Sequence, residues 1–528
     1  MSRRKAPAQT LIPAVGLLAF SIFLSTRLVG FSAPQGEETS RQPSAQSRAG
    51  ELPPSFDKDV ARVEKEMDRI EEEALLQIKA TTLDRQGQVR TLGKLLLFDK
   101  HLSVNQNEAC SFCHTPETGF TGPIESLNLG TVAYPGSVRY RFSQRKPQSY
   151  MYATFAPVLH YNGLQGDFVG GNFWDMRASG YRLQSPSAEQ AQGPPTNPVE
   201  MGLPDSACLA YRLSKAPYRK LFEEVWGTDS FSIQWPADVE RICATPAPPP
   251  ENDLYPVHLG GADRQRSDKV YDAFGLSAAA YEASPEVSPF TSKYDYVQSG
   301  QAQFTDQEAR GYALFRGKAR CNECHRDGGP GEEPLFTDFT ASNLGVPRNG
   351  AVQFYFEAAP DKHGYSANPE GASYRDLGVG HFLRKLQSLS GQLNPDSCWI
   401  SLAPKYEGKF QVPTLRNVDM RPRPDFVKAY MHNGYFKSLK EVVHFYNTRD
   451  VLPTCKPGAY GEKITCWPPP ENPVNVNARQ LGNLHLTDQE EDDIVAFLRT
   501  LTDDYNQSRS VHQNYPAATN RQPNPSSR

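Results

Sequence analysis

The chain has 528 residues with a formal net charge of -4, 44 Pro, 39 Gly and 38% hydrophobic residues. This length exceeds what one packed core usually reaches, so we expect two domains plus tails, and the Pro and Gly content predicts many long ordered loops. A slightly acidic chain gives no reason to expect nucleic acid as a partner, because that requires a clustered basic surface, and a small soluble partner or substrate fits better.

Residues 1–33 have the pattern of a signal peptide or N-terminal anchor. Three basic residues at positions 3–5 precede an apolar run from Leu11 to Leu24, and small and polar residues follow it. The run is short for a membrane span, but no clear A-x-A cleavage site follows, so an uncleaved anchor is the alternative to a cleaved signal. Either outcome places the rest of the chain outside the cytoplasm, and we expect a periplasmic protein.

Residues 34–84 are expected to form a linker and a surface helix. The stretch 34–54 is rich in Ser, Gln, Glu, Gly and Pro, which cannot bury enough apolar surface to order themselves. From Phe56 to Ala80, apolar residues recur at near-helical spacing among charged ones. We interpret this segment as a solvated helix, with docking to a partner as the alternative. The apolar positions are Val60, Val63, Met67, Ile70 and Leu75.

Two later segments, 92–114 and 309–325, resemble each other and both end in C-x-x-C-H. This motif is the signature of covalent c-type haem attachment: two thiols bond the vinyl groups and the histidine ligates the iron. A zinc site would need four converging ligands, and a redox disulfide would not need the trailing histidine. We therefore predict two covalently bound haem c groups. The attachment residues are Cys110, Cys113 and His114 in the first motif and Cys321, Cys324 and His325 in the second.

Two capping boxes mark helices of a second haem domain. Thr305 with Glu308 begins the helix before the second motif, and Thr487 with Glu490 begins a last helix that has one apolar face. A last helix packed over a haem is how small c-type cytochrome domains usually close. We expect a mainly α fold with two cytochrome c-like haem domains, at 85–300 and 301–504, and a disordered polar tail at 505–528.

Five cysteines lie outside the haem motifs. An exported protein can form disulfides, and two pairings are plausible, with one thiol left unassigned by the odd count. The pairings are Cys208 with Cys243 and Cys455 with Cys466, and Cys398 is the thiol left over.

Four further stretches carry a resemblance to a known family. NFWDMRA at 172–178, EQAQGPPTNPVEMG at 189–202, FQVPTLRNV at 410–418 and AYMHNGYFKSLKEVVHFYN at 429–447 resemble the di-haem cytochrome c peroxidase and MauG family. The resemblance covers roughly Leu92 to Leu501. It implies that the haem on His114 reacts with peroxide and that the haem on His325 transfers electrons.

The resemblance also implies roles for three side chains. Glu200 and Gln190 fall where the family has a distal acid-base pair, and a partly buried carboxylate can move a proton between the oxygens of peroxide. Trp174 matches the tryptophan between the haems, where an aromatic ring can relay electrons. The alternatives are purely structural roles: a surface or capping carboxylate for Glu200 and a core aromatic for Trp174.

The second haem is expected to have Tyr446 as its sixth ligand. The peroxidase branch of the family has methionine at this position and the MauG branch has tyrosine. Tyrosinate favours ferric iron whereas methionine raises the potential, so the resemblance implies a low-potential second haem. Met431 is the rival ligand, and Tyr446 as a core aromatic is the bland alternative.

Two departures from the family pattern stand out. No histidine lies between His114 and His160, so no residue of the first loop is available to block the first iron, and we predict that it is open to peroxide. The calcium that the family holds between its haems is doubtful, because Lys146 stands at the position of an asparagine ligand and a cationic side chain opposes a hard cation. The carbonyl positions correspond to Val427 and Ala429, and Lys146 or Lys428 is expected to replace the charge.

The sequence thus predicts an oxidoreductase, a di-haem c-type peroxidase that reduces hydrogen peroxide to water with electrons from a small cytochrome c or copper protein. A MauG-like enzyme that oxidises residues of a partner protein is the alternative within the family. A non-enzymatic di-haem electron carrier would require both irons to be six-coordinate. A haem-based sensor that uses the 56–80 helix would bind a partner without turnover.

Overall fold

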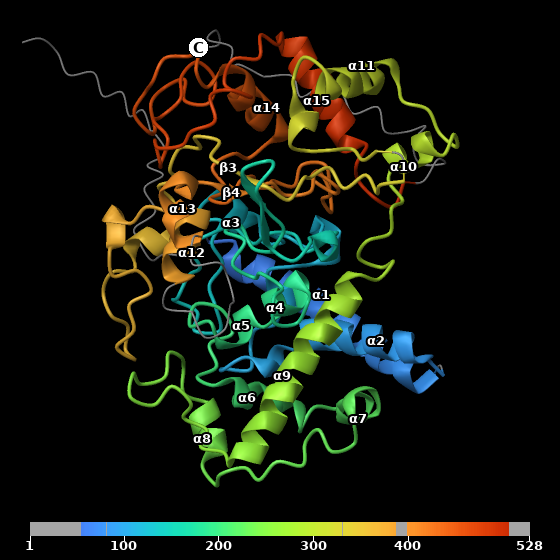
Figure 1. Ribbon diagram of the computed structural model, residues 1–528, viewed down its shortest axis with the longest axis vertical. Helices are drawn as coiled ribbons and strands as arrows, with labels where there is room; N and C mark the ends of the chain where they lie inside the picture. The colour runs from blue at the N-terminus through green and yellow to red at the C-terminus, as the bar shows by residue number, and fades with distance from the viewer. Residues whose placement is uncertain (1–53, 81, 330, 387–398, 506–528) are drawn as a thin grey trace, which may run out of the picture. The chain divides into compact units, whose positions relative to one another are not determined.

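A computed structural model describes residues 54–80, 82–329, 331–386 and 399–505 (Figure 1). The predicted signal or anchor, most of the linker, Cys398 and the C-terminal tail lie outside these ranges. Within them, helices predominate and the named strands form two short antiparallel pairs, as the mainly α expectation requires. The pairs are β1 His160–Asn162 with β2 Asp167–Val169, and β3 Ala341–Ser342 with β4 Phe410–Gln411.

A first apolar core lies around the helices before and after the first motif. Helix α2, Arg85–Phe98, packs lengthwise on α9, Gly261–Glu282, and α4, Pro186–Ala191, and α6, Ser206–Leu213, pack on the same α9 (Figure 1). Gly93 permits the close approach of α2 and α9, because a Cβ there would lie 2.0 Å from Ser277 O.

A second core repeats this arrangement around the second motif. Helix α11, Asp306–Arg316, packs on α15, Asp488–Arg499, and α14, Leu439–Thr448, lies against α15. Both predicted capping boxes are confirmed, at the N-termini of α11 and α15. A Cβ on Gly311 would lie 1.9 Å from Asp493 O, so a glycine again lets the helix before the motif meet the closing helix. The parallel with Gly93 supports a duplicated unit.

The remaining helices are short and frame the loops. Each haem motif begins with one turn of 3-10 helix, η2 at Cys110–Phe112 and η5 at Cys321–Glu323. The other 3-10 turns are η1 Lys100–Leu102, η3 Pro116–Thr118, η4 Ala153–Phe155, η6 Gln353–Phe356 and η7 Gly371–Ser373. The other α-helices are α3 Glu125–Leu129, α5 Gly193–Thr196, α7 Arg219–Trp226, α8 Val239–Cys243, α10 Lys293–Gln298, α12 Val379–Lys385 and α13 Trp399–Tyr406.

Helix α1, Phe56–Ala80, forms where the sequence predicts it, but it is not merely a solvated helix. Val63, Met67 and Ile70 are at most 5% exposed and belong to the first core, where α1 contacts α2 and the turn of the first motif. Lys100 Nζ also donates to Asp68 Oδ1 at 2.7 Å. The apolar stripe therefore packs on this chain itself, and its burial corrects the solvated interpretation.

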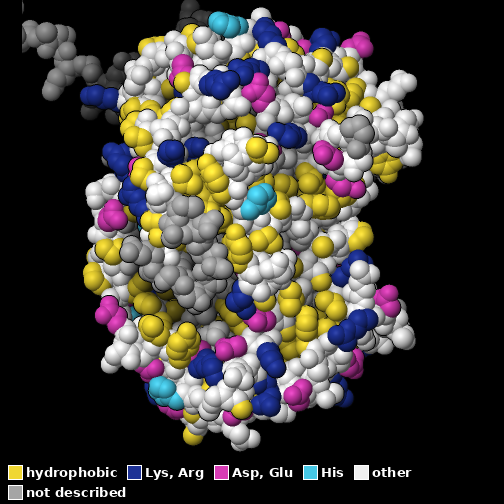
Figure 2. Space-filling view, viewed as in Figure 1, with side chains coloured by type: hydrophobic (Ala, Val, Ile, Leu, Met, Phe, Trp, Pro, Cys, Tyr) yellow, Lys and Arg dark blue, Asp and Glu magenta, His cyan; other side chains and the backbone are white. Residues whose placement is uncertain are grey.

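Both plausible disulfides are present. Cys208 and Cys243 join α6 to α8 with a Cα–Cα distance of 5.3 Å, and Cys455 and Cys466 close a surface loop at 5.7 Å. None of the helices in the described ranges is long and apolar enough to cross a bilayer. On the face shown in Figure 2, Lys and Arg side chains are interspersed with Asp and Glu.

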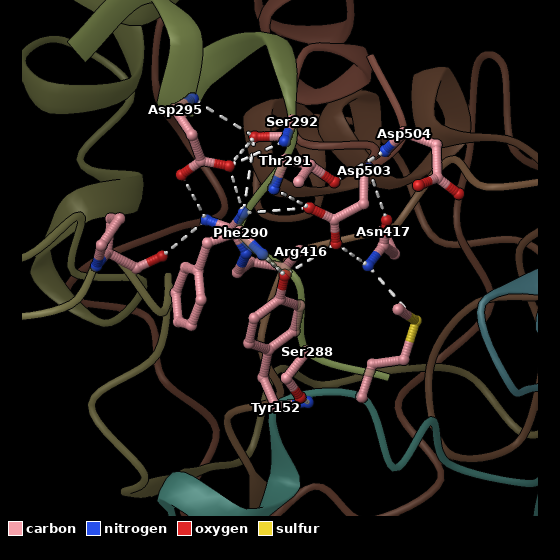
Figure 3. A network of polar contacts seen from close by, with 12 residues as sticks. Tyr152, Ser288, Phe290, Thr291, Ser292, Asp295, Arg416, Asn417, Asp503 and Asp504 are labelled. Atoms are coloured by element: carbon pink, nitrogen blue, oxygen red, sulfur yellow. Dashed lines mark hydrogen bonds and ion pairs between the residues drawn. The ribbon is translucent and has the colours of Figure 1, made fainter. Parts of the chain in front are cut away.

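A buried polar network around Arg416 ties the two halves of the described chain together (Figure 3). Arg416 has a fully buried side chain that pairs with Asp295 on α10 and with Asp503 beyond α15. Asn417 Nδ2 donates to Asp503 Oδ2 at 2.6 Å, and Tyr152 from the first half donates its hydroxyl to the same oxygen at 2.7 Å. The Tyr152 ring also lies 4.6 Å from the Arg416 guanidinium carbon.

Tyr152→Phe is expected to lower the free energy of unfolding by about 2 kcal/mol, because a buried carboxylate loses one charge-assisted hydrogen bond. Urea unfolding followed by far-UV circular dichroism measures this. Tyr140→Phe is the matched control, since the Tyr140 ring is 46% exposed. Equal loss in both variants would mean that the hydroxyl of Tyr152 contributes nothing specific.

Candidate active site

Residues of both C-x-x-C-H motifs line one cavity of about 690 Å³ between the two cores. The lining comes from both halves of the described chain. The predicted site residues that line this cavity are Cys110, Cys113, His114, Trp174, Gln190, Glu200, Cys321, Cys324, His325, Met431 and Tyr446.

The histidine of each motif is prepared to ligate a metal. His114 Nδ1 lies 2.7 Å from Phe120 O, and His325 Nδ1 lies 2.9 Å from Phe336 O. Burial lowers the pKa of His114 to about 4 and lowers that of His325, so both rings are neutral. A neutral ring that donates from Nδ1 to a carbonyl keeps its lone pair on Nε2, which is the arrangement that metal-binding histidines use.

The four motif thiols are free, unlike the four cysteines in disulfides. Burial raises the pKa of the thiols of Cys110, Cys321 and Cys324 to about 12. In the ranges that the structure describes, no group of three or more His, Cys, Asp or Glu can hold a metal ion. The two thiols and the neutral histidine of each motif fit the covalent attachment of one haem group per motif.

Glu200 lies beside the first motif. It follows α5, and its Oε1 accepts a hydrogen bond from Asn197 Nδ2 at 2.7 Å. Burial raises the pKa of Glu200, and Arg177 and Asn197 lower it in part. The charge of Glu200 adds to the burial that raises the pKa of Cys110, and both residues line the same cavity. Gln190, on α4, lines the same cavity.

Trp174 lines the same cavity and is fixed by a hydrogen bond from Nε1 to Lys146 O at 3.0 Å. Its ring is 6.4 Å from that of His432, which stacks on Phe410 at 3.6 Å. Burial lowers the pKa of His432 to about 3, so this ring is neutral. His432 was not predicted from the sequence, where it appears only as a histidine in a Gly- and aromatic-rich loop.

Tyr446 and Met431 both line the cavity near the second core. Tyr446 is on α14, and burial together with the charges of Cys321 and Cys324 raises the pKa of its hydroxyl. The tyrosine therefore lies close to the second motif. The choice between the two ligands stays a prediction, as does the open face at His114. His160, in β1, is exposed and is absent from the described lining of the cavity.

Two further carboxyl groups that line the cavity were not predicted from the sequence. Glu108 is buried, lines the cavity and pairs with Arg139 at 2.7 Å. Glu282, at the end of α9, is 1% exposed, lines the cavity, and its Oε2 has no partner among the described residues. Burial raises the pKa of Glu282 to about 8, so it is protonated at neutral pH. The acidic residue in the apolar stretch AAAYEA was the only signal.

The residues at the family's calcium position do not fit a calcium ion. Lys146 Nζ donates to Thr121 Oγ1 at 2.6 Å, and the carbonyl of Val427 accepts a hydrogen bond from Asn128 Nδ2 at 3.1 Å. The carbonyl oxygen of Val427 is thus engaged by a hydrogen-bond donor, and the side chain at position 146 supplies an amino group in place of an oxygen ligand.

Comparisons with known proteins show which family the chain is similar to. The model of the family described as di-haem cytochrome c peroxidase matches residues 88–303. The methylamine utilization protein MauG of Paracoccus denitrificans is 32% identical over 417 residues, which cover 78% of this chain and 88% of that protein. The cytochrome-c peroxidase IdrP1 of Denitromonas iodatirespirans is 27% identical over 417 residues, which cover 78% of this chain and 80% of that protein. The crystal structure of the diheme peroxidase BthA from Burkholderia thailandensis matches with a TM-score of 0.56 and 27% identity, over 80% of this chain and 90% of that one.

Proposed function

Because the chain belongs to the di-haem cytochrome c peroxidase and MauG family, we propose that it reduces hydrogen peroxide to water with two electrons from an external donor. The observation that supports this most is the shared cavity, which Glu200 and Trp174 line together with residues of both motifs. Peroxide reduction uses a positioned acid–base group, because the O–O bond must be protonated as it breaks, and a buried carboxylate can supply it.

Each site residue has its own role in the proposed reaction. When bound, the two haems supply the iron that takes peroxide and a second iron that passes electrons. His114 and His325 hold these groups through Nε2. Glu200 takes the proton of the near oxygen of peroxide and returns it to the far oxygen, which leaves as water, while Gln190 orients the substrate. Two electrons and two further protons complete the reaction H₂O₂ + 2H⁺ + 2e⁻ → 2H₂O.

The electron donor is a small cytochrome c or copper protein that docks near the second haem. Trp174 relays electrons between the two motifs, and its ring centroid is 6.4 Å from that of His432. The export pattern of the N-terminus places the reaction in the periplasm, where such donors are found. The structure does not describe residues 1–53, so secretion and anchoring stay predictions.

A MauG-like reaction is the second candidate, in which the electrons come from residues of a bound protein substrate. Two observations favour it: the 32% identity with the Paracoccus MauG, and a tyrosine at position 446 near the second motif. A tyrosinate ligand favours the oxidised iron and so favours retention of oxidising equivalents.

One experiment separates these functions. The purified ferric protein is mixed with peroxide, with and without a reduced small cytochrome c, and both peroxide and the visible spectrum are followed. Two donor equivalents oxidised per peroxide consumed is the result expected of a peroxidase. A spectrum changed by peroxide that persists, with slow use of the donor, favours the MauG-like reaction. No peroxide consumption, with both irons six-coordinate, would leave only an electron carrier or a sensor.

A further inference from the structure

The segment after the first motif, 115–132, packs against segment 417–437 of the second half. The contact is tied through backbone atoms: Asn128 Nδ2 donates to Val427 O at 3.1 Å, and Val427 N donates to Glu125 Oε1 at 2.6 Å. We call this contact the junction. Because it borders the cavity, whatever holds it also fixes the two haem motifs relative to each other.

Two buried lysine side chains donate hydrogen bonds to residues of the junction. Lys428 belongs to segment 417–437, and Lys146 lies outside both segments. Lys428 is 4% exposed and Lys146 is 8% exposed, and both line the cavity. Each amino group donates to oxygen atoms of the chain and not to a carboxylate. The acceptors are Thr118 O (2.8 Å) and Met420 O (2.6 Å) for Lys428, and Thr121 Oγ1 (2.6 Å) and Pro147 O (3.0 Å) for Lys146.

These contacts give neither amino group an anionic partner. Burial lowers the pKa of Lys146 to about 7. Burial and the charge of Lys146 lower the pKa of Lys428 well below its usual range, with Arg421 lowering it and Asp419 raising it. Buried ammonium groups persist only when they are paired. The propionate carboxylates of a bound haem c group would be partners of the right charge.

The junction offers few ligands for a metal ion. Calcium takes six to eight oxygen ligands, and carboxylates are usual among them. Asn128 Oδ1 is buried without a partner among the described residues, yet one neutral oxygen falls far short of that number. The two amino groups would also repel a divalent cation at short range.

We propose that the amino groups of Lys146 and Lys428 take the place of a divalent metal ion in the junction, so that this protein joins its two halves without calcium. The chain supplies both parts of the function of such an ion. The hydrogen bond from Lys428 Nζ to Thr118 O connects the halves, and the carboxylates of a bound haem would favour the charged form of both amino groups. The inference does not depend on which reaction the enzyme catalyses.

The metal content of the wild-type holoprotein provides the first test. The protein is purified in buffer that contains calcium, desalted, and analysed by plasma mass spectrometry. We expect far less than one calcium per chain, and no change in Tm or in the visible haem spectrum after treatment with EGTA. About one calcium per chain, with a lower Tm after its removal, would overturn the proposal whatever the variants do.

Lys146→Asn provides the second test, because it removes an amino group and adds an amide oxygen. We expect a Tm lower by about 2–8 °C in EGTA and a partial recovery on addition of calcium. Lys437→Met is the matched control: Lys437 Nζ also donates across the junction, to Asn128 O at 2.6 Å, but it is not among the described residues that line the cavity.

Lys437→Met is expected to lower Tm equally with and without calcium. A Tm for Lys146→Asn that equals the wild-type value in both buffers would contradict the proposal. If Lys146→Asn yields no folded protein, Lys428→Met takes its place, with a shift in the haem midpoint potentials as the readout. Unshifted potentials in that variant would show that the charge of Lys428 does not reach the haems.

Discussion

Glu200→Gln is expected to lower the rate of peroxide reduction by about 10²–10⁴-fold while both haems stay attached. Glutamine keeps the size of the side chain and its hydrogen bond with Asn197, so the cavity keeps its shape. It cannot take a proton from the near oxygen of peroxide. Stopped-flow measurement of the reaction of the ferric protein with peroxide gives the rate, and the pyridine haemochrome assay gives the haem content.

The pH dependence of this rate gives a second signature of Glu200. Burial raises the pKa of Glu200, and the reaction requires its deprotonated form. The wild-type rate is therefore expected to fall as the pH falls through this raised pKa, at a higher pH than for an ordinary glutamate. Glu200→Gln has no such group, so its residual rate is expected to be flat over the same range.

Glu282→Gln is the control for these measurements. Glu282 is also buried and lines the cavity near Cys110, and its pKa of about 8 makes it protonated and unable to act as the first base at neutral pH. Its replacement is expected to change the rate by less than about tenfold. A larger loss in Glu282→Gln than in Glu200→Gln would assign the proton transfer to Glu282.

The fold follows from the sequence where the signal is local. C-x-x-C-H places two thiols and a histidine within one turn, and the structure forms a 3-10 turn at both motifs. Thr305 and Thr487 cap the helices predicted for them. The burial of α1 could not be predicted in the same way. Periodicity shows that Val63 and Met67 share a face, but it does not show what covers that face.

Sequence also predicts only those site residues whose roles do not depend on packing. Glu200, Trp174 and Tyr446 could be predicted because a resemblance assigns roles to their positions, and they line the cavity. His432 and Glu282 could not, because their importance depends on burial and on neighbours distant in the sequence. A histidine or a glutamate on its own is an ordinary residue, and only packing shows that it faces a shared cavity.

Tyr446→Met is expected to raise the midpoint potential of the second haem by on the order of 0.1 V or more, within the roughly 0.8 V range that axial ligands control. Tyrosinate stabilises ferric iron, whereas the methionine thioether favours ferrous iron. Position 446 is on α14, whose residues Leu439 and Val443 also line the cavity, so the new side chain points to the same space. Spectroelectrochemical titration measures both potentials, and a higher second potential is also expected to speed electron uptake from the donor.

Met431→Leu separates the two candidate ligands. If Tyr446 holds the second iron, Met431→Leu leaves both midpoint potentials within a few hundredths of a volt of the wild type. The substitution then only replaces the apolar Met431 side chain with another of similar volume. If Met431 is the ligand, the effects reverse: Met431→Leu lowers the potential or leaves the iron five-coordinate, and Tyr446→Met changes little. That reversal would remove the argument for a MauG-like reaction from Tyr446. The role of Glu200 would be unaffected, since it rests on the other motif.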